Sequence, residues 1–134
     1  MFADSISTLP SFLTYFAVAV TILAAFLFVY LNFTPYREIA LIREGNTAAA
    51  VSLSGTLVGF ALPVANVIEN SHHLVDLVLW ASIACVVQLL TYVAARATLP
   101  HLAKDIPEGK LAPAIFLAAL SVSVGLINAA CMEY

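Results

Sequence analysis

Charged residues are scarce in this sequence, at only 10% of its 134 residues. Soluble domains carry about 25% charged residues, which keep their surfaces compatible with water. With 63% hydrophobic residues and a mean hydropathy of +1.02, this chain lacks the polar side chains for such a surface. The composition therefore excludes a soluble globular domain and indicates an integral membrane protein.

Four long stretches contain no Asp, Glu, Lys or Arg, namely 5–36, 45–68, 77–95 and 111–132. Each is close to, or longer than, the roughly 20 apolar residues that a helix needs to cross a bilayer. We expect a single all-α membrane domain over 1–134. Its four transmembrane helices are predicted near 11–33, 47–68, 74–95 and 111–132.

Basic residues are missing from one side of this predicted arrangement. Four spans place the loops 34–46 and 96–110 on the same side of the membrane, and the basic residues in or beside them are Arg37, Arg43, Arg96, Lys104 and Lys110. These are all five basic residues of the chain. Because basic loops remain cytoplasmic, we expect both termini on the opposite side of the membrane.

The chain also has little of what catalysis or cofactor binding requires. It shows no Ser-His-Asp arrangement, no phosphate-binding glycine loop and no paired carboxylates within the spans. Its two cysteines, Cys85 and Cys131, fall at different depths, so no internal disulfide is expected. The basic loops contain nearly as many acids as bases, which argues against nucleic-acid binding. We expect no enzymatic activity, no cofactor, and contact with the lipid bilayer.

Two segments 64 positions apart resemble each other, with the sequence IREGNTAAA at 42–50 and IPEGKLAPA at 106–114. Each segment lies between two apolar stretches, so the chain is predicted to consist of two two-helix repeats. The repeats are expected near 11–68 and 74–132. Because each unit holds two spans, they are parallel repeats, related by an axis along the membrane normal.

The shared motif of the two segments comprises Glu44, Gly45, Asn46, Glu108 and Gly109. Gly45 is expected to end a short helix as its C′ residue. Asn46 is expected to be the N-cap of the second span, since its side-chain oxygen can accept a hydrogen bond from the first helical turn. In the second segment Lys110 stands in place of the capping Asn.

The loop over 36–45 is predicted to be a short interfacial helix. Tyr36 and Ile39 are expected to face lipid, and Arg37 and Glu38 to face water. Tyr30, near the end of the first span, suits the aromatic belt at the membrane surface.

Small residues cluster on the second and fourth spans, at Gly55, Gly59, Ser121 and Gly125. Small side chains let helix backbones approach closely in lipid, so we interpret these positions as helix-packing surfaces. The face of Gly55 and Gly59 could instead close a gate or an interface between copies. Whether the partner helix belongs to the same chain is left open.

Polar residues also lie within the spans, including Gln88 of the third. Asn66 and Asn128 occupy nearly equivalent points of the two repeats. One interpretation is interhelical hydrogen bonding. The alternative is a polar path across the membrane, with the candidate residues Ser52, Ser54, Thr56, Asn66 and Asn128.

A polar turn is predicted between the second and third spans. It contains Glu69, His72, His73 and Asp76. His72 and His73 are weak candidates for metal binding or pH sensing. Because the spacing matches no zinc signature, no metal site is assigned.

The segment 42–51, followed by Gly55 and Gly59, resembles the YjfL-like family of small bacterial inner-membrane proteins, catalogued as domain of unknown function 350. The resemblance implies four spans in the bacterial inner membrane, and hence periplasmic termini. It implies no established activity, although such proteins are discussed mainly around envelope stress.

We therefore expect a non-enzymatic, homo-oligomeric inner-membrane protein with a structural or envelope-stress role. A cytoplasmic or membrane protein partner is also compatible with the basic loops. The alternative is a small channel or transporter that uses the polar path.

Overall fold

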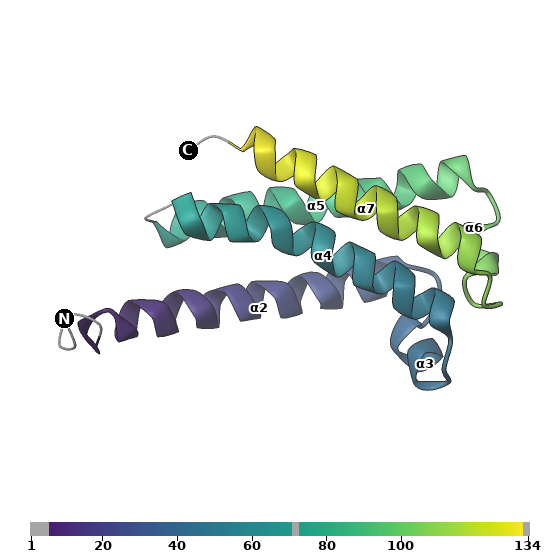
Figure 1. Ribbon diagram of the computed structural model, residues 1–134, viewed down its shortest axis with the longest axis horizontal. Helices are drawn as coiled ribbons and strands as arrows, with labels where there is room; N and C mark the ends of the chain where they lie inside the picture. Colours follow the sequence, from purple (N-terminus) through teal and green to yellow (C-terminus); the bar gives the residue numbers. More distant parts are fainter. Residues whose placement is uncertain (1–5, 71–72, 133–134) are drawn as a thin grey trace.

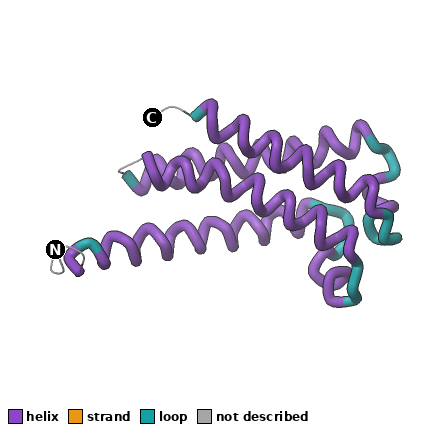
Figure 2. Tube along the Cα trace, in the orientation of Figure 1, coloured by secondary structure: helices purple, strands orange, loops and turns teal. Residues whose placement is uncertain are grey.

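The computed structural model describes residues 6–70 and 73–132, and within these ranges it contains only helices and the turns that join them (Figures 1 and 2). Four helices are long and apolar enough to cross a membrane. They are α2 (Leu9–Phe33), α4 (Thr47–Asn70), α5 (Leu74–Thr98) and α7 (Leu111–Cys131). The predicted all-α fold with four spans is confirmed, and every predicted helix end falls within three residues of the observed one.

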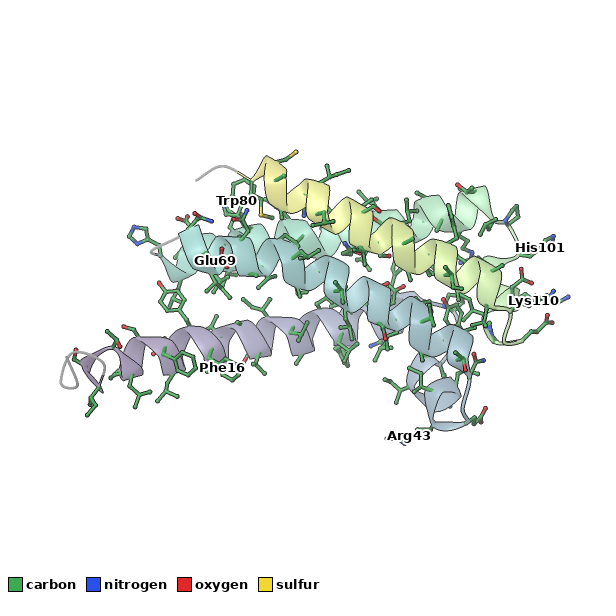
Figure 3. All side chains as sticks on the ribbon, viewed as in Figure 1. Phe16, Arg43, Glu69, Trp80, His101 and Lys110 are labelled. Carbon is green, nitrogen blue, oxygen red and sulfur yellow. The ribbon has the colours of Figure 1, made fainter. Side chains whose placement is uncertain are left out.

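Two short helices, α3 (Glu38–Arg43) and α6 (Leu102–Asp105), lie together at one end of the bundle, and α2 begins and α7 ends at the other (Figure 1). The end formed by α3 and α6 holds every Lys and Arg of the chain and is called the basic end below. Arg43, His101 and Lys110 are seen there in Figure 3, with Phe16, Glu69 and Trp80 in the other half of the molecule.

The turn after α3 shows why Gly45 is needed. Gly45 has a φ of 87°, a left-handed conformation that glycine adopts without strain. The N–H of Gly45 donates to the carbonyl of Ile42, and the N–H of Asn46 donates to the carbonyl of Leu41, both at 2.9 Å. These two bonds form a Schellman motif, which confirms Gly45 as the predicted helix stop.

The turn after α6 repeats this geometry. Gly109 has a φ of 84° and donates its N–H to the carbonyl of Ile106 at 2.9 Å. The N–H of Lys110 donates to the carbonyl of Asp105 at 3.1 Å. The Nζ atom of Lys110 also lies 3.4 Å from a carboxylate oxygen of Asp105, so this turn is closed by an ion pair as well.

Helix α4 forms the centre of the bundle and contacts α2, α3, α5 and α7, with its longest interface against α7. Among the 18 most apolar consecutive residues of each helix, 56% are buried in α4 and 6% are buried in α2. In its second half α2 packs on the middle of α4, where the rings of Phe26 and Phe60 stack with centroids 4.0 Å apart. Toward its beginning α2 diverges from α4 (Figure 1), and Phe12 and Phe16 are exposed.

Candidate functional site

A buried carboxyl group lies at the basic end of the bundle. Glu38, the first residue of α3, is only 1% exposed, and Tyr36 before it is 8% exposed. The prediction that Glu38 faces water and Tyr36 faces lipid is therefore wrong. Their positions follow from the packing of α3 against α4, which turns the start of α3 into the bundle.

One oxygen of this carboxyl group is satisfied and the other is not. The hydroxyl of Thr34 donates to Oε1 of Glu38 at 2.6 Å, whereas Oε2 has no hydrogen-bond partner. Burial raises the pKa of the Glu38 carboxyl to about 7, and the hydrogen bond from Thr34 opposes this shift. Glu38 therefore changes its charge near neutral pH.

Three tyrosines from different parts of the chain lie near enough to Glu38 to interact with its charge. Tyr30 of α2, Tyr36 and Tyr92 of α5 each interact electrostatically with its carboxyl group. Burial raises the pKa of Tyr36 far above its ordinary value, so its phenol stays protonated and can donate a hydrogen bond. The prediction that Tyr30 belongs to an aromatic belt is wrong, since its side chain is fully buried and lies edge-on to Tyr92 at 6.0 Å.

Polar groups continue from Tyr30 toward the middle of the membrane. The hydroxyl of Thr56 lies 3.3 Å from the hydroxyl of Tyr30 and 3.4 Å from that of Ser121 on α7. The amide of Gln88 donates to the carbonyl of Ser121 at 3.2 Å, and its own oxygen has no partner. These polar groups, from Tyr30 to Gln88, form a buried polar series. Since Thr56 lies about 14 Å along α4 from Thr47, the series extends to roughly half the depth of a bilayer.

The small residues of α4 meet α7 of the same chain. A Cβ atom at Gly55 would overlap the backbone of Ala118, and one at Gly59 would overlap the carbonyl of Ser121. A Cβ atom at Gly125 would overlap the carbonyl of Gly59. The small side chains at these positions therefore allow direct contact between the two helix backbones.

Pro63 explains why the carbonyl of Gly59 is available to another helix. Proline has no N–H, so Gly59, four residues earlier, accepts no hydrogen bond within α4 from that position. A hydrogen on the Cα of Gly125 points toward this carbonyl, where a Cβ would otherwise lie. Contacts of this Cα–H···O kind recur at helix interfaces.

Asn46 joins the two loops of the basic end. Its Oδ1 accepts a hydrogen bond from the N–H of Ala49 at 3.0 Å, which confirms it as the N-cap of α4. Its Nδ2 donates to the carbonyls of Ile106 and Pro107 at 3.1 and 3.2 Å. One side chain thus caps α4 and fixes the second loop against the first.

Two substitutions separate these roles of Asn46. Asn46→Ser keeps a capping hydroxyl but cannot reach the second loop, so we expect it to cost about 1–2 kcal/mol of unfolding free energy. Asn46→Ala also removes the cap and is expected to cost about 1 kcal/mol more. Circular dichroism during denaturant titration in micelles measures both. A Ser variant as stable as the wild type would show that the bonds between the loops contribute nothing.

The residues of the predicted polar path lie in different surroundings. Ser52 and Thr56 are buried, whereas Ser54 is exposed on the other side of α4. Asn66 donates to the carbonyl of Ala129 on α7 at 2.5 Å, which is an interhelical bond. Asn128 is half-buried, and its Nδ2 has no partner.

The other polar cluster predicted from the sequence lies between α4 and α5. His72 falls outside the described residues, and His73 is exposed at the start of α5. Among residues 6–70 and 73–132, no group of three or more His, Cys, Asp or Glu side chains could hold a metal ion.

Comparison with known proteins gives a family and a relative. The family model described as Domain of Unknown Function (DUF350) matches residues 4–132. The chain is 35% identical over 129 residues to the UPF0719 inner membrane protein YjfL of Escherichia coli strain K12, which covers 96% of this chain and 98% of that protein. The protein of the same name from Escherichia coli O157:H7 gives the same values. No solved structure matches the chain significantly.

These matches confirm the resemblance seen in the sequence. Together with the four apolar helices, they support a multi-pass protein of the inner membrane. Neither description assigns an activity or indicates a catalytic family.

Proposed function

This chain belongs to the DUF350 family, and we propose that it is a non-enzymatic, homo-oligomeric inner-membrane protein with a structural role in the cell envelope. The observation that carries the proposal is the poor packing of α2 within the single chain. The glycines of α4, which suggested association at the sequence level, are already covered by α7. A further copy is therefore expected to pack on α2.

The outward face of α2 carries polar groups that suit this role. Thr14, Thr21 and Asn32 are exposed and share one side of the helix, since they follow one another at 7 and 11 residues, close to whole numbers of turns. Each donates to the carbonyl four residues earlier, yet each keeps an acceptor oxygen. Polar side chains of this kind hydrogen-bond between helices in membranes.

Cysteine cross-linking in lipid tests this assignment. In a background with Cys85 and Cys131 replaced by Ala, we expect Thr14→Cys and Thr21→Cys to form intermolecular disulfides on mild oxidation, because residues near a symmetry axis meet their own copies. Ser82→Cys, also exposed but on α5, is the matched control and is expected to remain monomeric. Equal cross-linking at all three positions would indicate random collision and would contradict the α2 interface.

We further propose that the basic end faces the cytoplasm and that the two halves are parallel repeats. The positive-inside rule supports the orientation, which places both termini in the periplasm. The repeated turns at Gly45 and Gly109 support the duplication. The duplication is also supported by two bonds between α4 and α7, from Asn66 to Ala129 and between Thr56 and Ser121. They join positions 63 and 65 residues apart, close to the 64 residues that separate the two copies of the motif.

A small channel or transporter is the second candidate function, favoured by the buried polar series from Tyr30 to Gln88. In this structure the contact of Gly59 with Gly125 separates Thr56 from Asn66 along α4, so conduction would require α4 and α7 to part there. Ion or solute flux into proteoliposomes that is lost in Asn66→Leu would support this candidate. Wild-type liposomes as tight as empty ones across a broad panel of solutes would exclude it.

A further inference from the structure

The carboxyl group of Glu38 is buried without a compensating positive charge. Among the residues that the structure describes, no Lys or Arg forms an ion pair with Glu38, whereas Lys110 at the same end pairs with Asp105 and Glu108. Arg37 and Arg43, at the two ends of α3, are exposed. An ionised carboxylate left in such a place costs several kcal/mol, which favours binding of a cation or a proton.

The groups that act on Glu38 come from α2, α5 and the segment between α2 and α3. Thr34 donates to one oxygen, and the three phenols of Tyr30, Tyr36 and Tyr92 interact with the carboxyl group. On α4, the hydroxyl of Thr56 lies 3.3 Å from the hydroxyl of Tyr30. These groups carry no charge at neutral pH.

One basic side chain acts on this cluster from a distance. Arg96, on the last turn of α5, is exposed and interacts with the hydroxyl of Tyr92. The buried cluster itself contains one carboxyl group, that of Glu38, and the neutral hydroxyls of Thr34 and the three tyrosines. A single carboxylate matches one positive charge, whereas a divalent metal ion would need further acidic ligands.

We propose that Glu38, which is buried and hydrogen-bonded by Thr34, is a reversible proton-binding site at the basic end of the bundle. The proton binds Oε2, the oxygen that has no partner in the structure. When the proton leaves, the phenols of Tyr36 and Tyr92, which interact with each other and with the carboxyl group, can turn to donate to the carboxylate. The site thus holds two states, one neutral and one anionic.

The site is placed to exchange protons with the side that the basic end faces. Glu38 lies at the start of α3, directly after the turn that follows α2, and not in a membrane span. Burial brings the pKa of its carboxyl to about 7, so both states are populated near neutral pH. The site lies within a single chain and does not depend on oligomer formation.

Infrared spectroscopy of the wild-type protein in lipid tests the site directly. With isotope-labelled glutamate, the C=O stretch of a protonated carboxyl group is followed as the pH rises. We expect one glutamate to lose its proton with a midpoint near 7. Glu38→Gln is expected to remove this transition, and the control Glu44→Gln, an exposed acid on the same loop, to leave it unchanged.

Two further arms complete the experiment. Tyr36→Phe is expected to raise the midpoint, because one donor to the carboxylate is lost; a lowered or unchanged midpoint would contradict the role of the phenol. The titration is repeated in sodium and in potassium salts, and a midpoint independent of the cation supports a proton site. A midpoint that falls as either salt concentration rises would overturn the proposal in favour of a metal cation. A wild-type protein without any glutamate transition between pH 5 and 9, a range of about two units either side of the expected value, would also overturn it.

Discussion

Replacing Gly125 with alanine is expected to lower the unfolding free energy by about 3 kcal/mol, at the upper end of the usual range for overpacked cores. The added Cβ would overlap the carbonyl of Gly59, and backbone atoms cannot move aside as a flexible side chain does. The substitution would also remove the Cα–H that faces this carbonyl, which Pro63 leaves without a helical donor. Thermal or denaturant unfolding of the purified protein in lipid measures the loss.

A matched control separates this effect from a general sensitivity of α7. Ala119→Val adds two methyl groups to an exposed position of the same helix and is expected to change stability by less than about 0.5 kcal/mol. If Gly125→Ala unfolds at the wild-type midpoint, α4 and α7 are not in backbone contact, and the account of the bundle centre fails.

Glu38→Gln is expected to make the protein more stable than the wild type above pH 7, by up to about 3 kcal/mol. In the folded protein the pKa of Glu38 is raised to about 7 from an ordinary value of 4.5, so the folded state binds more protons than the unfolded state between these values. The contribution of Glu38 to wild-type stability therefore falls as the pH rises from 4.5 to 7 and levels off above that range.

The glutamine variant lacks this pH dependence because it has no carboxyl group to ionise. At pH 4 both proteins carry a neutral side chain at this position, so their stabilities should agree to within about 1 kcal/mol. Unfolding free energies measured across the pH range give the comparison. A wild-type protein whose stability rises over the same interval relative to Glu38→Gln would show that Glu38 is ionised and paired when folded.

The four spans and the helix stops could be predicted because they depend on local properties. An apolar stretch crosses the membrane whatever packs beside it, and the left-handed turn at Gly45 is closed by hydrogen bonds within six residues. The capping role of Asn46 was predicted for the same reason. Its second role was not, because the carbonyls of Ile106 and Pro107 lie 60 and 61 residues away in the sequence.

The buried site could not be predicted because it depends on how α3 is oriented. In the sequence, Glu38 lies beside Arg37 in a polar loop, a pattern that is typical of exposed side chains. Only the packing of α3 on α4 turns Glu38 inward, and only the approach of α5 brings Tyr92 to it. Tyr30 and Tyr92, near the ends of two spans, are a partial signal, since a phenol can hydrogen-bond a buried carboxyl group as well as lie at a membrane surface.

The partner of the glycine-rich face was likewise not readable from the sequence. Gly55 and Gly59 could have packed on another copy, but in the structure they meet Ala118 and Ser121 of the same chain. This leaves α2 as the helix that one chain packs least, and it moves the expected interface from α4 to α2.

The mass of the lipid-embedded protein tests this central claim most directly. Native mass spectrometry from nanodiscs, at several protein-to-disc ratios, is expected to show an oligomer for the wild type and for Ser82→Leu. The triple variant Thr14→Leu, Thr21→Leu, Asn32→Leu is expected to give monomers. Wild-type protein that is monomeric at every ratio would contradict the proposal that α2 is completed by a second copy.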